Sequence, residues 1–320
     1  MADKQRILIT GASGFIGSFL CEEALRRGFD TWAAVRRTSS RKWLKLDGLQ
    51  FVELDMTNPD VLRSQLSEHE GWDVVVHAAG ATKCLNKAEF DFHNFECTKN
   101  LVEALAALGK LPRQMLYMSS LSAIYGSAYG ESKLKTEGWL TDFFNKENTS
   151  SLVIFRPTGV YGPREKDYFM MVKSIKQHMD FEAGLEPQKL TFVYVRDVVG
   201  AVFASIEHNV EGGIFNLTDG QVYSSRDFSR LIQNELGVKW VFRLKAPLWF
   251  LRFISCLSED ISHITKKPST LNRDKYKIMA QRDWTCDISP MVEVLHYTPQ
   301  WQLERGVKEA IEWYKKENWI

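Results

Sequence analysis

A tyrosine and a lysine lie four residues apart in the segment Tyr129-Gly130-Glu131-Ser132-Lys133. On a helix, this spacing places both side chains on one face. A free tyrosine has a pKa of about 10 and is a poor base at neutral pH. A lysine ammonium ~4 Å away offers the phenolate up to roughly 4 kcal/mol at an effective dielectric constant of about 20. The pair therefore predicts a general acid/base in which Lys133 lowers the pKa of Tyr129.

A hydroxyl group precedes this pair at the end of a predicted strand. The apolar run Gln114–Met118 is expected to be a strand and continues into Ser119-Ser120-Leu121-Ser122. Tyr129 to Lys146 is expected to be the helix that follows it. In this arrangement Ser120 is best placed to hold a substrate oxygen beside Tyr129.

Three glycines near the start of the chain predict a phosphate-binding turn. They lie after the apolar run Ile7-Leu8-Ile9 and before a helical pattern that runs from Phe15 to Gly28. Such a turn lets the backbone approach a pyrophosphate closely, and the helix N-terminus offers free N–H groups. The residues expected to bind the dinucleotide here are Gly11, Ser13, Gly14, Phe15, Ile16 and Gly17.

The end of the second predicted strand, Thr31–Val35, bears on which dinucleotide binds. A carboxylate at this position suits NAD, whereas an arginine accommodates the 2′-phosphate of NADP. Here Arg36 and Arg37 follow the strand and no carboxylate does. We therefore expect NADP, with NAD as the second choice, and a solvated basic loop is the alternative. After the third strand, Asp55 and Met56 are candidates to contact adenine, although Asp55 equally suits a turn.

Six predicted strands alternate with helices in the first half of the chain, which favours a doubly wound parallel α/β sheet. We expect this dinucleotide-binding domain over residues 1–165. A smaller α/β substrate lobe is expected over 166–320, with some segments crossing back and with its own strand at Gly213–Leu217. After the fourth strand, His77 is expected to be structural, whereas Ala78, Ala79 and Gly80 are small enough to lie against the cofactor. The six strands are Arg6–Thr10, Thr31–Val35, Gln50–Leu54, Asp73–Val76, Gln114–Met118 and Ser151–Phe155.

The composition argues against several classes of protein. The net charge of +1 gives no global field for nucleic acid. The five cysteines are scattered, without zinc-ligand spacing, and fit a reducing compartment, so we expect no metal and a cytoplasmic protein. The most apolar later segment, 247–257, is far shorter than the ~20 residues that span a membrane. We expect it to be a packed helix face, with peripheral membrane contact through Trp249, Phe250 and Phe253 as the alternative.

These motifs together resemble the extended short-chain dehydrogenase/reductase superfamily, in its NAD(P)-dependent epimerase/dehydratase family. The resemblance implies that Tyr129 is the acid/base, that Lys133 holds the nicotinamide ribose, and that a serine polarises the substrate oxygen. It implies that Pro157 and Val160 lie beside the nicotinamide, and that a homodimer could form through the long helices. It places Thr82, Arg164, Tyr194 and Arg196 near the substrate. The matching segments are 10–17, 77–80, 94–101, 118–120, 129–133, 156–164, 193–198 and the C-terminal 295–314.

The chain departs from the family pattern at two points. One extra residue separates Ser120 from Tyr125-Gly126, so Ser122 is the alternative to Ser120. Only Ser127 and Ala128 then precede Tyr129, where family members carry a longer loop over the substrate. Either the site is unusually open, or a loop is missing from the chain.

The resemblance leaves the reaction open. The first hypothesis is an epimerase acting on a nucleotide sugar; a dehydratase is disfavoured because Leu121-Ser122-Ala123 replaces the usual acidic pair. The alternative is an NADPH-dependent aldehyde or ketone reductase, resembling flavanone-type reductases and 3β-hydroxysteroid dehydrogenases in its Val35-Arg36-Arg37 strand end. Aromatic residues of the substrate lobe could line an apolar pocket for it. A non-catalytic NADP-binding module is the third hypothesis, and the Tyr129/Lys133 pair argues against it.

Overall fold

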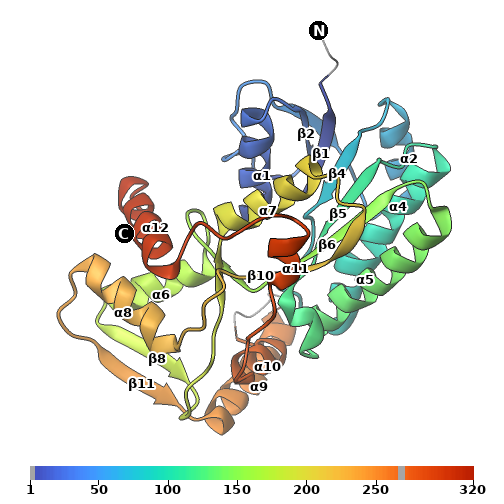
Figure 1. Ribbon diagram of the computed structural model, residues 1–320. Coiled ribbons are helices and arrows are strands. Elements are labelled where there is room, and N and C mark those ends of the chain that lie inside the picture. Colours follow the sequence, from blue (N-terminus) through green and yellow to red (C-terminus); the bar gives the residue numbers. More distant parts are fainter. Residues whose placement is uncertain (1–3, 266–270) are drawn as a thin grey trace.

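A seven-stranded, entirely parallel sheet forms the centre of the molecule (Figure 1). The computed structural model describes residues 4–265 and 271–320. The strand order is β10-β6-β5-β4-β1-β2-β3, so the order reverses beside β1, which lies between β2 and β4. Ligands of such sheets bind at this reversal, beyond the carboxyl ends of the strands. The strands are β1 Arg6–Thr10, β2 Asp30–Val35, β3 Gln50–Glu53, β4 Val74–His77, β5 Gln114–Met118, β6 Ser151–Pro157 and β10 Gly212–Leu217.

Helices cover both faces of the sheet, which confirms the doubly wound fold. α1 (Phe15–Arg26) and α7 (Val195–Glu207) pack together on one face, and their apolar residues share one core with the strands. The other face carries a second core. Continuous apolar strands such as Val74-Val75-Val76, fully buried here, are typical of a sheet covered on both sides. The helices over the second core are α2 Pro59–Ser67, α4 Cys97–Ala107 and α5 Ala128–Glu147.

The sequence placed the strand near Gly213 in the smaller lobe, and this was wrong. β10 pairs in parallel with β6, from Gly212 opposite Leu152 to Leu217 opposite Pro157, and becomes the seventh strand of the central sheet. The chain thus leaves the sheet after β6 and returns through α7 and β10. The local sequence of a strand carries no label for its partner, whereas an unpaired β6 edge would leave buried backbone groups unsatisfied.

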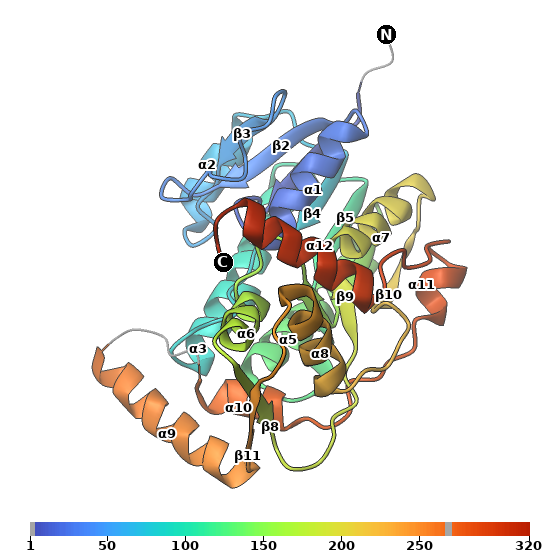
Figure 2. The same ribbon diagram turned by 90° about the vertical axis from the view of Figure 1, so that its left-hand side faces the viewer.

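The smaller lobe contains two short parallel strand pairs and a third core. β7 (Gly159–Tyr161) pairs with β9 (Phe192–Tyr194), and β8 (Met179–Ala183) pairs with β11 (Phe242–Ala246). Figure 2 shows α6, α8 and α12 grouped in this lobe, with α9 at its edge. Its helices are α6 Asp167–Lys176, α8 Ser225–Leu236, α9 Leu248–Thr265, α10 Arg273–Ala280, α11 Ser289–Glu293 and α12 Leu303–Lys316.

The long helix expected from Phe92 begins earlier and is irregular. α3 (Lys87–Phe90) starts behind Asn86, whose side chain accepts a hydrogen bond from the Glu89 amide. A π-helical segment, η1 (Asp91–Glu96), joins α3 to α4. Such π-turns insert one residue per turn and are frequent at functional sites.

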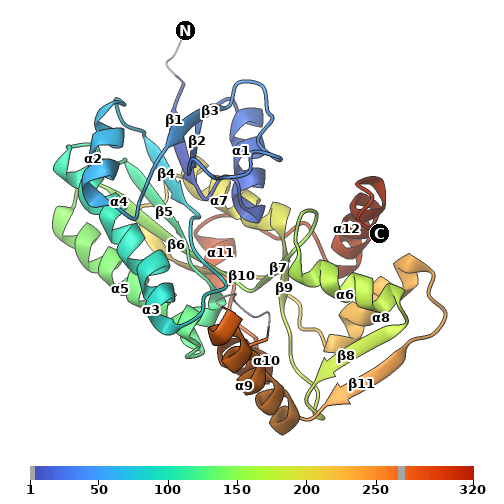
Figure 3. The same cartoon turned by 180° about the vertical axis from the view of Figure 1, so that it is seen from behind.

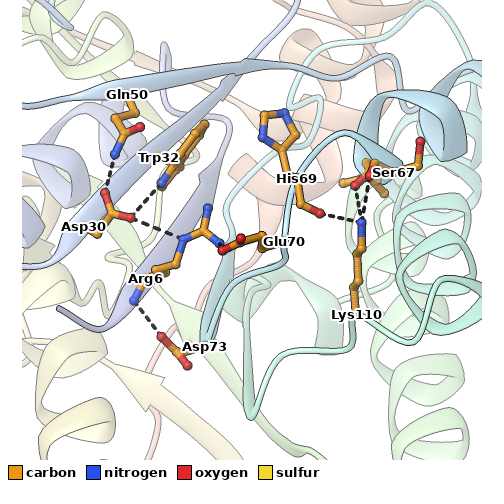
Figure 4. A network of polar contacts seen from close by, with 10 residues as sticks. Arg6, Asp30, Trp32, Gln50, Ser67, His69, Glu70, Asp73 and Lys110 are labelled. Carbon is orange, nitrogen blue, oxygen red and sulfur yellow. Dashed lines mark hydrogen bonds and ion pairs between the residues drawn. The ribbon is translucent and has the colours of Figure 1, made fainter. Parts of the chain in front are cut away.

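A polar network ties the strands at the amino edge of the sheet (Figure 4). Arg6 Nε donates to Asp30 at 3.3 Å, and the Arg6 amide donates to Asp73 at 2.7 Å. Asp30 also accepts from Trp32 Nε1 at 3.1 Å and from Gln50. Because these residues stand where β1 to β4 begin, the network stabilises the edge opposite the candidate site.

Candidate active site

Tyr129 and Lys133 lie in the first turns of α5, where the carboxyl end of β5 meets the lobe. Ser127 begins the helix, because its hydroxyl accepts a hydrogen bond from the Gly130 amide at 2.9 Å. Gly130 brings α5 close to the preceding turn: a Cβ there would lie 2.0 Å from the carbonyl oxygen of Ser122. Local capping and this close approach therefore fix the pair in space.

Lys133 is buried, with 4% of its surface exposed. Its Nζ donates to the Met118 carbonyl at 2.9 Å and lies 4.9 Å from the centre of the Tyr117 ring. Burial disfavours the ammonium and lowers the pKa of Lys133 to about 8, and the nearby Glu137 carboxylate only partly opposes this.

Tyr129 retains its proton at neutral pH in the chain by itself. Burial raises the pKa of Tyr129 to about 12, and hydrogen bonding from Ser120 partly offsets that rise. The ring packs against Phe90 with centroids 5.9 Å apart. In the chain by itself, desolvation dominates the pKa of Tyr129, and the Lys133 ammonium donates to the Met118 carbonyl. The lowering of the Tyr129 pKa by Lys133 in the complex with the cofactor stays a prediction.

Of the two candidate hydroxyls, Ser120 is the one next to Tyr129. Its Oγ also accepts from the Ser122 amide at 3.1 Å, and so starts the 3₁₀ turn η2 (Leu121–Ile124). Ser122 is buried in that turn, and its carbonyl faces Gly130. The geometry therefore favours Ser120, as the strand register suggested.

Asn94 is a buried positioning residue to which the sequence analysis assigned no role. It lies in the π-helical segment η1, and its side chain accepts from the Ala81 amide at 2.7 Å and donates to Ser132 at 2.9 Å. The Asn94 side chain also explains the glycine at position 80, because a Cβ there would lie 2.9 Å from Asn94 Oδ1 and 3.1 Å from Lys133 Nζ. The motif 94–101 was the only signal for it.

A buried ion pair supports the same helix one turn further on. Glu137, 2% exposed, accepts hydrogen bonds from both Ser119 on the β5 end and Arg156 on β6. These contacts join α5 to two adjacent strands. No local pattern in the sequence indicates this pairing, since the three residues are far apart along the chain.

The short link before Tyr129 does not leave that end of the helix open. Asp274 of α10 accepts hydrogen bonds from the Ala128 amide and, at 3.5 Å, from the Tyr129 amide. Lys277 of the same helix donates to the Gly126 carbonyl at 3.2 Å. A segment from the C-terminal part of the chain thus covers the short link before Tyr129, and the sequence alone offered no sign of this.

The glycine turn has the form required for a dinucleotide. Gly11 adopts a positive φ of 67°, and a Cβ on Gly17 would lie 2.2 Å from the Gly11 carbonyl oxygen. No side chain caps α1 at Gly14, and its first turn contains no acidic residue. The helix N-terminus therefore presents a free partial positive charge to an anion, and the residues fit a bound pyrophosphate.

The arginines that follow β2 differ in their contacts. Arg36 and Arg37 are exposed, and neither guanidinium has an ion pair within the described parts of the chain. Arg41, by contrast, lies over the Phe51 ring at 4.4 Å. The carboxylate of Asp55 accepts from the amide and hydroxyl of Thr57, so it serves the turn, which was one of the two roles considered for it.

The remaining cofactor candidates lie along the carboxyl edge. Ala78 and Ala79 follow β4, and the Ala79 amide donates to Thr10 Oγ1 at 3.2 Å. The Met56 carbonyl accepts from Asn100 at 2.9 Å. Pro157 ends β6 and Val160 lies in β7. His77 is buried between the hydroxyls of Thr10 and Thr98, at 2.7 and 2.8 Å, and desolvation lowers its pKa to about 3, which agrees with a structural role.

Three of the four residues assigned to the substrate are not brought to Tyr129. Arg164 bonds Ser18 and Glu22 on α1, on the opposite face of the sheet from α5. Arg196 shares a cavity of about 250 Å³ with it, and Tyr194 is fully buried with its ring stacked on Trp301. Thr82 is exposed, next to Lys83, whose ammonium bonds Asp167 of α6 at 2.7 Å. The contact from the β4 side to the lobe is thus made by Lys83, next to Thr82.

Comparison with known proteins decides the family. The model described as "NAD dependent epimerase/dehydratase family" matches residues 7–218. The chain belongs to the NAD dependent epimerase/dehydratase family. It is an enzyme of the extended short-chain dehydrogenase/reductase type, as the sequence motifs predicted.

The names of similar curated proteins indicate different substrates. An uncharacterised UDP-glucose epimerase of Bacillus subtilis is 27% identical over 96% of both chains. A ceramide reductase of Caulobacter vibrioides is 24% identical, covering 98% of this chain and 96% of its own. A decarboxylating sterol-4-alpha-carboxylate 3-dehydrogenase of Saccharomyces cerevisiae is 22% identical, covering 98% and 99%.

Solved structures confirm the fold. UDP-glucose 4-epimerase of Thermotoga maritima, determined with UDP-glucose, superposes with a TM-score of 0.79 at 21% identity, covering 98% of this chain and 100% of that one. UDP-glucuronic acid 4-epimerase of Bacillus cereus, in complex with NAD, gives 0.75 at 21% identity, covering 98% and 99%. The family is described as NAD dependent, so the cofactor class is a nicotinamide dinucleotide. Within the described residues, no group of His, Cys, Asp and Glu could hold a metal ion.

Proposed function

We propose that this enzyme reduces an aldehyde or ketone with NADPH, using Tyr129 as the proton donor. The observation that carries the proposal is the pair of exposed arginines, Arg36 and Arg37, at the end of β2. They suit NADPH, the cofactor that a reductase consumes, and the hydroxyls of Tyr129 and Ser120 lie together at the end of β5. A bound nicotinamide dinucleotide would supply the hydride. Ser120 would hold the carbonyl oxygen, and Tyr129 would donate its proton to that oxygen as the carbon is reduced.

The protonation states are compatible with the reductive step. A pKa of about 12 keeps the proton on Tyr129 at pH 7, where it can be donated. Lys133 Nζ and Asn94 Oδ1 both lie next to Gly80, and Lys133 is proposed to orient the nicotinamide ribose. Arg36 and Arg37 are proposed to hold the 2′-phosphate of NADP, because their guanidinium groups are exposed where the ribose would lie. Asp55 and Met56 are proposed to border the adenine, and Pro157 and Val160 the nicotinamide.

A nucleotide-sugar epimerase, the first hypothesis from the sequence, is the other candidate, and the family model and the named epimerase relatives support it. It uses the same residues, with the hydride returned to the other face of the same carbon. An epimerase keeps its cofactor and shows no net consumption of it, whereas a reductase consumes one NADPH for each product molecule. A homodimer through α4 and α5 remains a prediction for either.

The role of Tyr129 is tested by Tyr129→Phe, which removes the proton donor and keeps the ring against Phe90. We expect turnover of a carbonyl substrate to fall by about 10²–10⁴-fold, with NADPH binding retained. Tyr125→Phe, which alters a nearby tyrosine that packs on Trp284, is the matched control and should keep its activity. Wild-type turnover in Tyr129→Phe would contradict the assignment of Tyr129 as the proton donor.

The cofactor preference is tested by Arg36→Ala. Losing a charge-assisted contact to the 2′-phosphate should weaken NADPH binding by about tenfold or more and leave NADH binding unchanged. Arg41→Ala is the control, since Arg41 packs on Phe51. Titration of protein fluorescence with both cofactors measures the two constants. Unchanged NADPH affinity together with tighter NADH binding would exclude NADP as the natural cofactor.

A further inference from the structure

The strand pair β8–β11 turns its apolar side away from the protein. Its polar side faces α8, where Asp180 accepts from Ser229 at 2.5 Å and Glu182 accepts from Ser225 at 3.0 Å. Residues that alternate with these carboxylates lie on the other side. Phe181 on β8 pairs with Leu244 on β11, and the two are 63% and 38% exposed. This is the reverse of an ordinary sheet, which buries its apolar face.

Helix α9 continues this uncovered apolar surface one residue after β11 ends. Trp249, Phe253, Leu257 and Ile261 repeat every fourth residue and form one stripe. Their exposed fractions are 72%, 63%, 52% and 52%. The opposite side of the helix contacts α10 and buries Ser255 completely. The expectation of a packed helix face was therefore wrong for this stripe.

The same helix is unsuited to crossing a membrane. Within the described parts of the chain, no helix is long and apolar enough to do so. α9 has 18 residues and is about 27 Å long. Figure 3 shows it projecting at the edge of the lobe, with the β8–β11 pair meeting its start. A helix of this kind can lie along an interface, with its apolar side buried in it.

Charge distinguishes between the partners that could cover this surface. From Val238 to Ser258 the sequence contains four basic residues and no acidic one, and the acidic pair Glu259-Asp260 that follows is paired with Arg273. Two of them, Lys239 and Arg252, are exposed and have no ion pair within the described residues. Tryptophan and cations beside an apolar stripe suit the headgroup region of an anionic bilayer. A two-fold contact with a second copy would instead bring the same cations together.

We propose that α9 and the apolar side of β8–β11 form a membrane-contact surface for anionic lipid bilayers, through which the enzyme takes a carbonyl-bearing lipid as its substrate. The surface adjoins the site: α10 packs on α9, and its Asp274 bonds the Ala128 and Tyr129 amides. The choice of substrate class rests on the reductase function proposed above, whereas the membrane contact does not.

The surface is tested by flotation of the full-length protein with vesicles of phosphatidylcholine, with and without phosphatidylglycerol. The wild type should float with the anionic vesicles and more weakly with the neutral ones. The double variant Trp249→Ser/Phe253→Ser should reduce the bound fraction at least about tenfold, because two large apolar side chains no longer enter the interface. Val222→Ser, at an apolar position 55% exposed outside this surface, should bind like the wild type.

The substrate class is tested on the same variants with hexadecanal in the vesicles and propanal in solution. The double variant should lose turnover of hexadecanal and keep that of propanal, which also shows that it is folded. Failure of the wild type to bind either vesicle overturns the membrane surface, as does a dimer in analytical ultracentrifugation that the double variant dissociates. Vesicle binding without turnover of either aldehyde overturns the reductase function and leaves the surface standing.

Discussion

Two ionisable side chains of the site are shifted in opposite directions by the same cause. Desolvation keeps the proton on Tyr129, whose pKa rises to about 12, and weakens its hold on Lys133, whose pKa falls to about 8. The lysine is therefore held in a site that disfavours its charge. A charged residue held in such a site lowers the stability of the fold, and its benefit lies in function.

The cost of burying Lys133 has a defined pH dependence. The unfolded chain binds the proton more tightly, with a pKa near the usual 10.5. The charge of Lys133 therefore lowers the free energy of unfolding by its full amount below about pH 8. This destabilisation decreases as the pH rises towards 10.5. Lys133→Met should raise the free energy of unfolding by about 1–3 kcal/mol at pH 7. The gain should shrink as the pH rises from about 8 towards 10.5, and activity should fall.

Urea unfolding of both proteins at several pH values measures this difference. Lys135→Met is the control, because Lys135 is 46% exposed and bonds only weakly to Asp91 at 3.8 Å. A gain in stability that is equal at pH 7 and pH 10 would contradict the prediction.

At the scale of elements, the site depends on the position of one helix end. Ser127 caps α5, η2 packs below it, and Asp274 of α10 holds its first amides. The π-helical segment η1 adds Asn94, which bonds Ser132 of α5. Each of these contacts fixes where Tyr129 lies relative to Ser120.

Alanine substitutions at two glycines of α5 distinguish the effect of helix position from the effect of helix propensity. In Gly130→Ala, the new methyl group would meet the Ser122 carbonyl at 2.0 Å, so α5 must shift and activity should fall more than tenfold. Nothing lies within 4 Å of a Cβ at Gly138. Gly138→Ala should therefore raise the free energy of unfolding by about 0.5–1 kcal/mol and keep full activity. Turnover and urea unfolding measure both effects; equal activity in the two variants would show that the close approach is unimportant.

At the scale of the whole molecule, the two parts of the chain are interleaved. α7 packs on α1, and β10 closes the sheet beside β6, although both follow the first half of the lobe in sequence. α10 then returns from near the C-terminus to the start of α5. The expected boundary at residue 165 therefore does not separate two continuous units in space.

This arrangement predicts the behaviour of a fragment. Residues 1–165 lack α7 and β10, so the edge of β6 and the apolar side of α1 would be exposed. We expect the fragment to show no cooperative urea unfolding by circular dichroism and to aggregate, whereas the full chain unfolds cooperatively. A fragment with a sharp transition and native-like stability would contradict the importance of β10.

The sequence by itself determined the glycine turn, six strands of the sheet, Tyr129, Lys133 and Ser120, because each is encoded by local spacing and periodicity. Only the tertiary structure decided the place of β10 in the sheet, the roles of Asn94 and Asp274, and the contact of Arg164 with α1. These depend on partners far along the chain. The tertiary structure also reversed one expectation that rested on an average: the α9 stripe is exposed, although apolar runs are usually packed.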